Sequence, residues 1–227
     1  MKTFATLILT LFAFGAADAQ ASAYLRQFRD IKLPTQAMIE KQSITNPVAA
    51  DNDRVKTTYA GATSAAAVTL TSFTAQPDVP RNLTITPTGT TTDVESCVIV
   101  ATGTDFFDRT ITENFTFAAN DSTLVAGNQA FKTVSSVVFP ADCESGGFAA
   151  TWIIGVGEKI GAKRCMAKAG HLVFSTIDGA YETTRATVAA DVDEVSKNTF
   201  DFNGTMDGTS DFEAFFIQNF GGANCLP

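Results

Sequence analysis

The sequence predicts an all-β protein: a β-sandwich or jelly-roll-like domain that follows an extended, partly helical N-terminal arm. Three observations favour this class, namely polar–apolar alternation with period two, frequent turn dipeptides, and a bias toward residues that suit a pleated sheet. Among the 227 residues are 19 phenylalanines, 3 tyrosines and 1 tryptophan. Hydrophobic residues make up 45% and charged residues 18%, which excludes a mainly disordered chain.

The first residues fit two interpretations. Lys2, the apolar run 4–14 and the small residues Ala17-Asp18-Ala19 are typical of a secretory signal peptide with its cleavage site. The run is too short for a transmembrane helix, which needs about 20 apolar residues. In the other interpretation, residues 1–20 are an apolar segment of an arm that packs on a neighbouring subunit.

Beyond this segment, a short helix is expected within 16–41 and should end at Pro34, because the residue before a proline avoids the α region. Residues 46–51 have the composition of a linker or an extended segment. We therefore expect an arm over residues 1–50 and a β-sandwich domain over residues 51–227.

The strand pattern begins after residue 51. Residues 67–73, 82–86 and 110–117 alternate polar and apolar side chains, which places one set inward and the other in water. Residues 97–100 and 152–154 are continuously apolar, so we expect them in central strands. About ten short strands are expected, with no helix of any length among them.

Turn dipeptides separate the expected strands. Asp178-Gly179, Asn203-Gly204 and Asp207-Gly208 favour tight hairpins, because such turns need positive φ at their central residues. Pro77 and Pro80 each fix φ and lack an N–H group, so they predict a rigid corner without strand pairing.

The formal net charge of −8 argues against direct binding to nucleic acid, whose phosphates are bound mainly by lysine and arginine. We expect no membrane contact either. The densest basic cluster is short and is expected to be a solvated loop; it comprises Lys159, Lys163, Arg164 and Lys168.

The four cysteines, Cys97, Cys143, Cys165 and Cys225, contain no C-x-x-C pair, which argues against a metal site. Four cysteines allow three disulfide pairings, and the sequence does not choose among these pairings or between them and free thiols. The sequence also has four N-x-[ST] sequons, which arise by chance in a chain rich in serine and threonine and decide nothing; they lie at Asn82, Asn114, Asn120 and Asn203.

No catalytic or cofactor-binding residues are predicted. His171 is the only histidine and begins an apolar run, where a structural strand-edge role is expected. The acidic group Asp191, Asp193 and Glu194 could in principle act as paired carboxylates, but short acidic clusters are usually solvated turns. We therefore expect a protein that is not an enzyme.

Three further segments receive structural interpretations. Residues 155–161 read G-x-G-x-x-x-G, one residue longer than a dinucleotide fingerprint and without a following helix, so we expect a glycine-rich loop. Residues 201–208 carry oxygen ligands at alternate positions, but Met206 and Phe212 stand where a calcium loop needs its glycine and glutamate. We therefore expect tight turns, with a weakly bound Ca²⁺ between acidic loops as the alternative. Residues 212–217 should form a core strand or, alternatively, a subunit contact.

Five pieces of the sequence, in order and spacing, resemble the capsid cement (decoration) proteins of tailed bacteriophages. The resemblance spans residues 55–165 and, more loosely, the rest of the chain, and its pieces are 76–84 (QPDVPRNLT), 100–105, 111–115, 129–134 and 155–161. The resemblance implies a virion structural protein on the capsid surface that bridges subunits of the major capsid protein, as a homotrimer or homodimer. The alternative is a secreted or surface-exposed β-sandwich that binds carbohydrate or a cell-surface ligand, which signal cleavage and oxidised cysteines would favour.

Overall fold

The computed structural model describes residues 38–60, 66–141, 143–144, 150–217 and 225. The chain divides into one unit over Met1–Met38 and another over Ile39–Pro227, and the second unit carries the fold. Within the described residues this unit contains fourteen strands and three single turns of 3₁₀ helix. The predicted all-β class is therefore confirmed. The helix expected within 16–41 falls mainly outside the described residues, and Ile39–Lys41 belong to a strand.

Short loops join most of these elements, as the frequent turn residues predict. The strands are β1 (Ile39–Ile44), β2 (Asp51–Ala60), β3 (Val68–Leu70), β4 (Arg81–Gly89), β5 (Cys97–Thr104), β6 (Thr110–Phe117), β7 (Val125–Phe131), β8 (Thr133–Phe139), β9 (Ala150–Gly161), β10 (Leu172–Ile177), β11 (Ala180–Tyr181), β12 (Thr187–Ala189), β13 (Thr199–Asp201) and β14 (Phe212–Ile217). The 3₁₀ turns are η1 (Thr91–Asp93), η2 (Ala169–His171) and η3 (Val195–Lys197).

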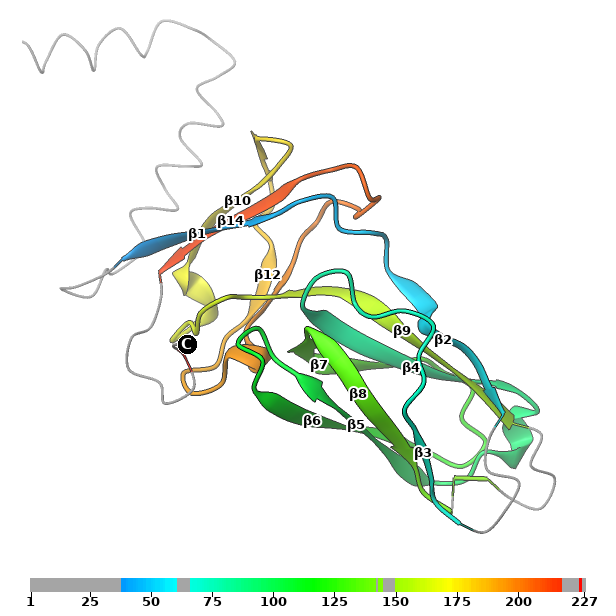
Figure 1. Ribbon diagram of the computed structural model, residues 1–227. Coiled ribbons are helices and arrows are strands. Elements are labelled where there is room, and N and C mark those ends of the chain that lie inside the picture. Colours follow the sequence, from blue (N-terminus) through cyan, green and yellow to red (C-terminus); the bar gives the residue numbers. More distant parts are fainter. Residues whose placement is uncertain (1–37, 61–65, 142, 145–149, 218–224, 226–227) are drawn as a thin grey trace, which may run out of the picture. The chain divides into compact units, whose positions relative to one another are not determined.

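The strands form three antiparallel sheets (Figure 1). Sheet A has the order β1-β14-β10-β11, and sheet C has the order β3-β8-β5-β6. Sheet B has the order β12-β13-β9-β4-β7, and β2 also pairs with β9. The two continuously apolar runs lie in β5 and β9, and each of these strands has neighbours on both sides, as predicted.

Sheets B and C pack face to face around a first core, which gives a β-sandwich. Because side chains alternate along each strand, one face of β4, β5, β6 and β9 supplies the buried set. Trp152 lies at its centre, with Phe117 at a ring-centroid distance of 5.0 Å and Phe139 at 5.6 Å. Aromatic residues that bury this much surface dominate the energy of such a core.

A second core lies between sheet A and the other end of sheet B. It contains Phe212, Ala214 and Phe216 from β14, together with Phe200 of β13 and Ile160 of β9. Strand β9 therefore contributes to both cores, because its earlier residues, such as Ile154, belong to the first one. Its twelve residues are long enough to extend from one core to the other.

The glycine-rich segment 155–161 is part of β9, so the prediction of a loop there was wrong. The glycines are needed because other groups come close to the strand. A Cβ on Gly155 would lie 2.0 Å from the carbonyl oxygen of Asp51, and one on Gly157 would lie 2.6 Å from the amide of Asn82. Glycine in a strand interior often marks such a close approach.

Strand β1 belongs to this folded unit, although the sequence placed residues 39–50 in an arm. All six of its residues pair with β14. The buried side chain of Gln42 extends the pairing to the end of β9. Its Nε2 donates to the carbonyl of Gly161 at 2.8 Å, and its Oε1 accepts from the N–H of Lys163 at 2.7 Å.

The turn dipeptides behave differently from one another. Asp178 and Gly179 have φ of 51° and 77° and connect β10 to β11, which is the predicted hairpin. Asn203-Gly204 and Asp207-Gly208 lie between β13 and β14, which belong to different sheets, so neither closes a hairpin. Gly208 still has a positive φ of 79°.

Residues 76–80 form the expected corner, and a buried arginine follows it. Arg81 is 0% exposed, and its Nε donates to the carbonyl of Gly157 at 2.7 Å. One terminal nitrogen donates to the carbonyl of Val48 at 2.9 Å and to Asp78 at 3.1 Å. The other lies 3.4 Å from the sulfur of Met206. One guanidinium thus joins the corner, the segment before β2, strand β9 and the loop before β14.

Replacing Arg81 by alanine is expected to lower the free energy of unfolding by about 3–5 kcal/mol, because it leaves Asp78 and two carbonyl groups without their buried partner. Urea unfolding measures the loss. The matched control is Lys132→Ala, which breaks an exposed ion pair with Asp108 (Nζ–Oδ1 2.8 Å). That change should cost about 1 kcal/mol or less. Equal losses in the two variants would contradict the role assigned to Arg81.

Candidate functional site

The outer face of sheet A is the candidate functional surface. Along β14, Phe212, Ala214 and Phe216 are buried in the second core, whereas Glu213 and Phe215 lie on the opposite face. The sequence offered two interpretations of residues 212–217, a core strand or a subunit contact. The core strand is shown, and the alternation leaves an outer face that is available for a contact.

An aromatic row crosses this face, from β1 to β11. The rings of Phe215 and Phe174 stack with centroids 4.2 Å apart and planes inclined by 22°. Tyr181 meets Phe174 edge-on at 5.2 Å, and the Nζ of Lys41 lies 5.5 Å from the centre of the Phe215 ring. The strand register explains the row, because Lys41 and Phe174 lie opposite Phe215 on its two neighbouring strands.

A polar row runs beside the aromatic row. Ser43 and Thr176 lie opposite Glu213 on the neighbouring strands. The Glu213 carboxylate accepts hydrogen bonds from Lys41 at 2.5 Å and from Thr176 at 3.2 Å. The hydrogen bond from Lys41 contributes most to lowering the pKa of this carboxyl, so it is ionised at neutral pH. The face therefore offers apolar rings and both charges.

The two ends of the face are the most accessible. Tyr181 is 59% exposed and Ile39 is 47% exposed. Aromatic side chains carry much of the binding energy in protein interfaces, because they bury a large area with few rotatable bonds. The sequence did not indicate Phe174, Tyr181 or Lys41, because cross-strand pairing joins residues that are far apart in the chain.

Two hollows lie near the loop 105–109. The first has a volume of about 190 Å³ and is lined by residues that include Ile44, Val79, Phe106 and Ile160. The second, of about 150 Å³, is lined by residues that include Asp105 and Glu194. Pockets that enclose a small organic ligand usually measure about 300–1,000 Å³. Neither hollow therefore fits such a ligand.

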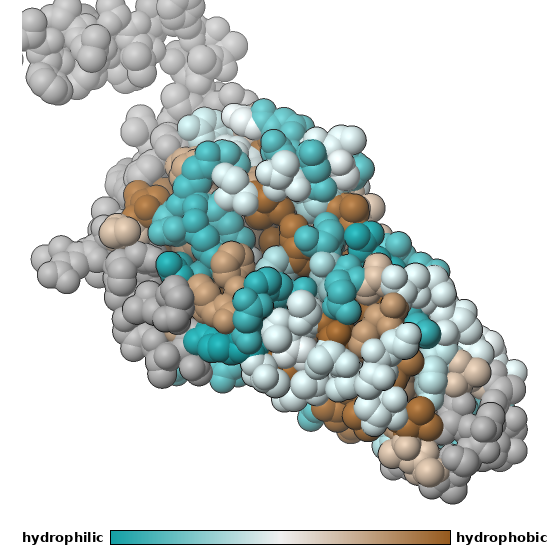
Figure 2. Space-filling view, in the orientation of Figure 1, coloured by the Kyte–Doolittle hydropathy of each residue, from teal (hydrophilic) through white to brown (hydrophobic). Residues whose placement is uncertain are grey.

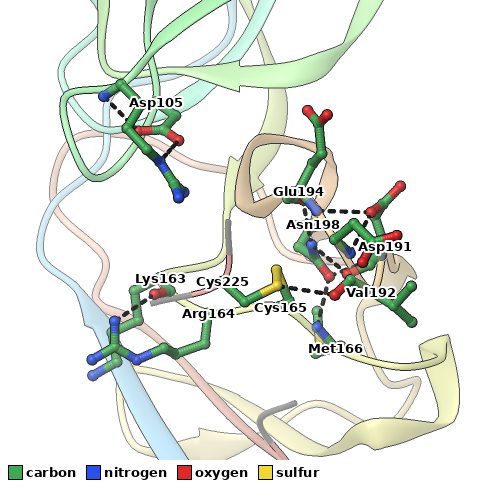
Figure 3. Close-up of a disulfide and its surroundings, with 12 residues drawn as sticks. Asp105, Lys163, Arg164, Cys165, Met166, Asp191, Val192, Glu194, Asn198 and Cys225 are labelled. Atoms are coloured by element: carbon green, nitrogen blue, oxygen red, sulfur yellow. Dashed lines mark hydrogen bonds and ion pairs between the residues drawn. A yellow bond between two sulfur atoms is a disulfide. The ribbon is translucent and has the colours of Figure 1, made fainter. Parts of the chain in front are cut away.

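The loop beside these hollows is held rigidly. The Asp105 carboxylate accepts from the backbone N–H groups of Phe107 and Arg109, at 2.8 and 3.0 Å, and from Arg109 Nε at 2.9 Å. Phe106 and Phe107 pack against a small cluster formed by Val195 and the disulfide Cys165–Cys225. Figure 3 shows this disulfide together with Asp105. The loop 105–109 therefore has a structural role, because its phenylalanines cover the disulfide.

The acidic group 191–194 also has a structural role. The Asp191 carboxylate accepts from the N–H groups of Asp193 and Glu194, and the Asn198 amide donates to the carbonyls of Asp191 and Glu194. Figure 3 shows the Glu194 side chain pointing away from Asp191. The Asp191 carboxylate is used to close this turn, so it does not form a working acid–base pair with Glu194.

His171 is buried at the end of η2, directly before β10, as expected for a structural histidine. Burial is the main cause that lowers its pKa, with Lys168 adding to the effect, and the backbone of Ile217 provides a hydrogen bond. None of these partners is a carboxylate or a nucleophile. In the turn 207–210, the Asp207 carboxylate accepts from the N–H groups of Thr209 and Ser210, which lowers its pKa to about 2.

The basic residues of 159–168 do not form one surface. Lys159 donates to Asn128 at 2.9 Å, whereas Lys163 pairs with Glu40 at 2.7 Å. Arg164 lies over the ring of Phe107 at 5.3 Å. In the part of the chain that the structure describes, no group of three or more His, Cys, Asp or Glu side chains could hold a metal ion. None of the helices there has the length and apolar character needed to cross a bilayer.

Comparisons with protein-family models, with curated proteins and with solved structures find no match to this chain. The resemblance to phage cement proteins therefore stays a prediction.

Glu113 is half-buried and Glu144 is buried, and both have raised pKa values without lining either hollow. Burial is the main cause for both Glu113 and Glu144. Glu113 Oε1 accepts from the N–H groups of Asn128 and Gln129, and its other oxygen has no partner within the described structure. Glu144 accepts from the indole N–H of Trp152 at 3.0 Å. Both side chains thus bind neighbouring elements together.

Glu113→Gln should become more stable than the natural protein as pH rises. The folded-state pKa of Glu113 lies above its ordinary value of 4.5, so its ionisation disfavours the fold from that pH upward. Glutamine keeps the accepting oxygen and removes the charge. The control is Glu213→Gln, because the pKa of Glu213 is lowered and the trend should reverse. Urea unfolding from pH 3 to pH 7 measures both, since the effect of Glu113 appears above pH 4.5 and that of Glu213 is lost below it. Parallel trends would contradict the assignment.

Proposed function

We propose that this chain is an extracytoplasmic β-sandwich binding protein whose contact surface is the outer face of sheet A. The observation that carries the proposal is the pairing of the cysteines. Cys97 bonds to Cys143 and Cys165 bonds to Cys225, and the structure describes no free cysteine.

The disulfides support an oxidising location. Such bonds form and persist outside the cytoplasm, where thiols are not kept reduced. Cys97 and Cys143 are buried in the first core, and Cys165 and Cys225 are buried in the small cluster beside the 105–109 loop. Buried pairs of this kind stabilise a fold by about 2–4 kcal/mol each. The N-terminal sequence agrees with this location, because it has the order of a secretory signal and its cleavage site.

The shape of the surface favours a macromolecular ligand. The rings of Phe174 and Phe215 cover each other, so the face presents ring edges, Tyr181 and Ile39 rather than a pocket. A flat face of this kind suits another protein surface. Because it combines a lysine, a carboxylate and apolar groups, it is chemically able to pair with a second copy of itself. The homo-oligomer expected from the sequence is therefore the first partner to test.

The virion hypothesis remains the second proposal, in which the chain bridges subunits of a major capsid protein on the capsid exterior. The ordered motifs of residues 55–165 support it. The motif around Arg81 also has a structural explanation that does not depend on a virion function, because its arginine holds the fold together. Two disulfides weigh against it, because capsids assemble in a reducing cytoplasm.

The intact mass of the protein from its native source, measured without reduction, tests the proposal. We expect the mass of a chain that begins near Gln20 or Ser22, and we expect no labelling by a thiol reagent until a reductant is added. A mass that includes residues 1–20, with thiols that react at once in unfolded protein, would overturn the extracytoplasmic location and favour the virion hypothesis.

Tyr181→Ser and Ile39→Ser should weaken self-association about tenfold or more, because they remove exposed apolar groups from the proposed contact. Sedimentation over a range of concentrations measures the change. Both positions are accessible, so the melting temperature should stay nearly constant. The matched control is Leu124→Ser, which removes a 39% exposed side chain outside sheet A. A natural protein that stays monomeric at every concentration would remove the self-association part of the proposal.

A further inference from the structure

We propose that Asn114 and Asn120 are N-glycosylated and that their glycans cover the outer face of sheet C. This inference depends on the proposed function, since only a chain that enters a secretory pathway meets the transferase. The donor is an oligosaccharide linked to a lipid pyrophosphate. The bond from its first sugar carbon to the pyrophosphate breaks, a bond from that carbon to the asparagine Nδ2 forms, and the amide loses one proton.

The structure separates the four sequons by what each asparagine side chain does. Asn82 is 2% exposed, its Nδ2 donates to the carbonyl of Gly127 at 3.1 Å, and its Oδ1 accepts from the N–H of Lys159 at 3.0 Å. The amide also packs against the bare backbone of Gly157. A glycan on Asn82 cannot be accommodated in this fold.

Asn203 is exposed, but its amide is engaged. Its Nδ2 donates to the carbonyls of Thr184 at 2.7 Å and Arg185 at 3.1 Å. A glycosylated amide keeps only one hydrogen, so one of these bonds would be lost. The loop 182–186 and the loop 203–208 would then lose part of their connection, and modification here is disfavoured.

Asn114 and Asn120 are exposed, and among the described residues their side chains hold no other element in place. Asn114 lies in β6, an edge strand of sheet C, and its sequon hydroxyl on Thr116 is exposed too. Asn120 is exposed in the turn after β6 with φ of 58°, and Ser122 beside it is exposed. Chain turns and sheet edges of this kind leave room for a bulky group.

The face around Asn114 provides a second, independent observation. Figure 2 shows the surface over β5, β6 and β8 as mostly white and brown, with little of the teal that marks hydrophilic residues. The strand registers place twelve side chains on the outer face of sheet C, and none is charged. They are Thr69, Val98, Val100, Thr102, Thr104, Thr110, Thr112, Asn114, Thr116, Thr133, Ser136 and Val138.

This composition fits a face that is covered by sugar. The chain has a net charge of −8, yet a whole sheet face carries none of it. An uncharged, flat sheet with an open edge strand is prone to associate edge to edge or face to face. A glycan at Asn114 and another at the end of the same strand would protect both the face and the edge without any charged residue.

The experiment uses the full chain with its own N-terminus, secreted from a eukaryotic cell line. Enzymatic release of N-glycans converts each modified asparagine to aspartate, and peptide mapping finds the converted positions. We expect conversion at Asn114 and Asn120 and none at Asn82. Asn114→Gln and Asn120→Gln should each remove one glycan, and so should Thr116→Ala and Ser122→Ala, which keep the asparagine. Asn203→Gln is the control and should leave the number of glycans unchanged.

Secreted protein without glycans, or with a glycan at Asn82, would overturn the inference. The same mass spectrum reads the N-terminus and the disulfides, which separates the two proposals. If the N-terminal segment is removed and the cysteines are paired while Asn114 and Asn120 are bare, only the inference fails. If the chain is retained in the cell with residues 1–20 intact, the proposed function and the inference both fail.

Discussion

The buried guanidinium of Arg81 connects strand β9, with which β4 pairs, to three segments that lie outside the sheets. It contacts Asp78 in the corner 76–80, the segment before β2, strand β9 and the loop before β14. Asp78 balances its charge. Burying a charge is costly unless hydrogen bonds and a counter-charge compensate for it. Because those compensating groups come from segments far apart in the sequence, the arginine is satisfied only when the whole arrangement is assembled.

Strand β9 connects the two cores of the fold, because it contributes side chains to both. Strand β9 pairs with β2, β4 and β13, and it supplies Trp152 to one core and Ile160 to the other. Close approach of β2 and of Asn82 to this strand is what requires its glycines. One disulfide lies in the first core and the other in the small cluster beside the 105–109 loop, so the covalent links reinforce contacts that packing already makes.

Local pattern predicted much of this fold and little of its surface. Alternation and apolar runs identified β5, β6 and β9, because side-chain period is a local property. Gly155 and Gly157 led to the wrong prediction of a loop, because these glycines are required by neighbours that are distant in the sequence. Residues 39–44 were assigned to the arm because their partner strand, β14, is far away in the sequence. The aromatic row was not predicted for the same reason, because Phe174 and Phe215 meet only when β10 pairs with β14.

Sheet A has a consequence for the order in which the protein is made. Ser43 and Glu213, which face each other in it, are 170 residues apart. During synthesis β1 emerges well before β14, the strand with which it pairs in the described part of the chain. Closing so large a loop is slow, because chain entropy is lost before any contact forms. The second core therefore stays open longest, and a chain cut short before β14 would expose β1 and β10 to chaperones and proteases.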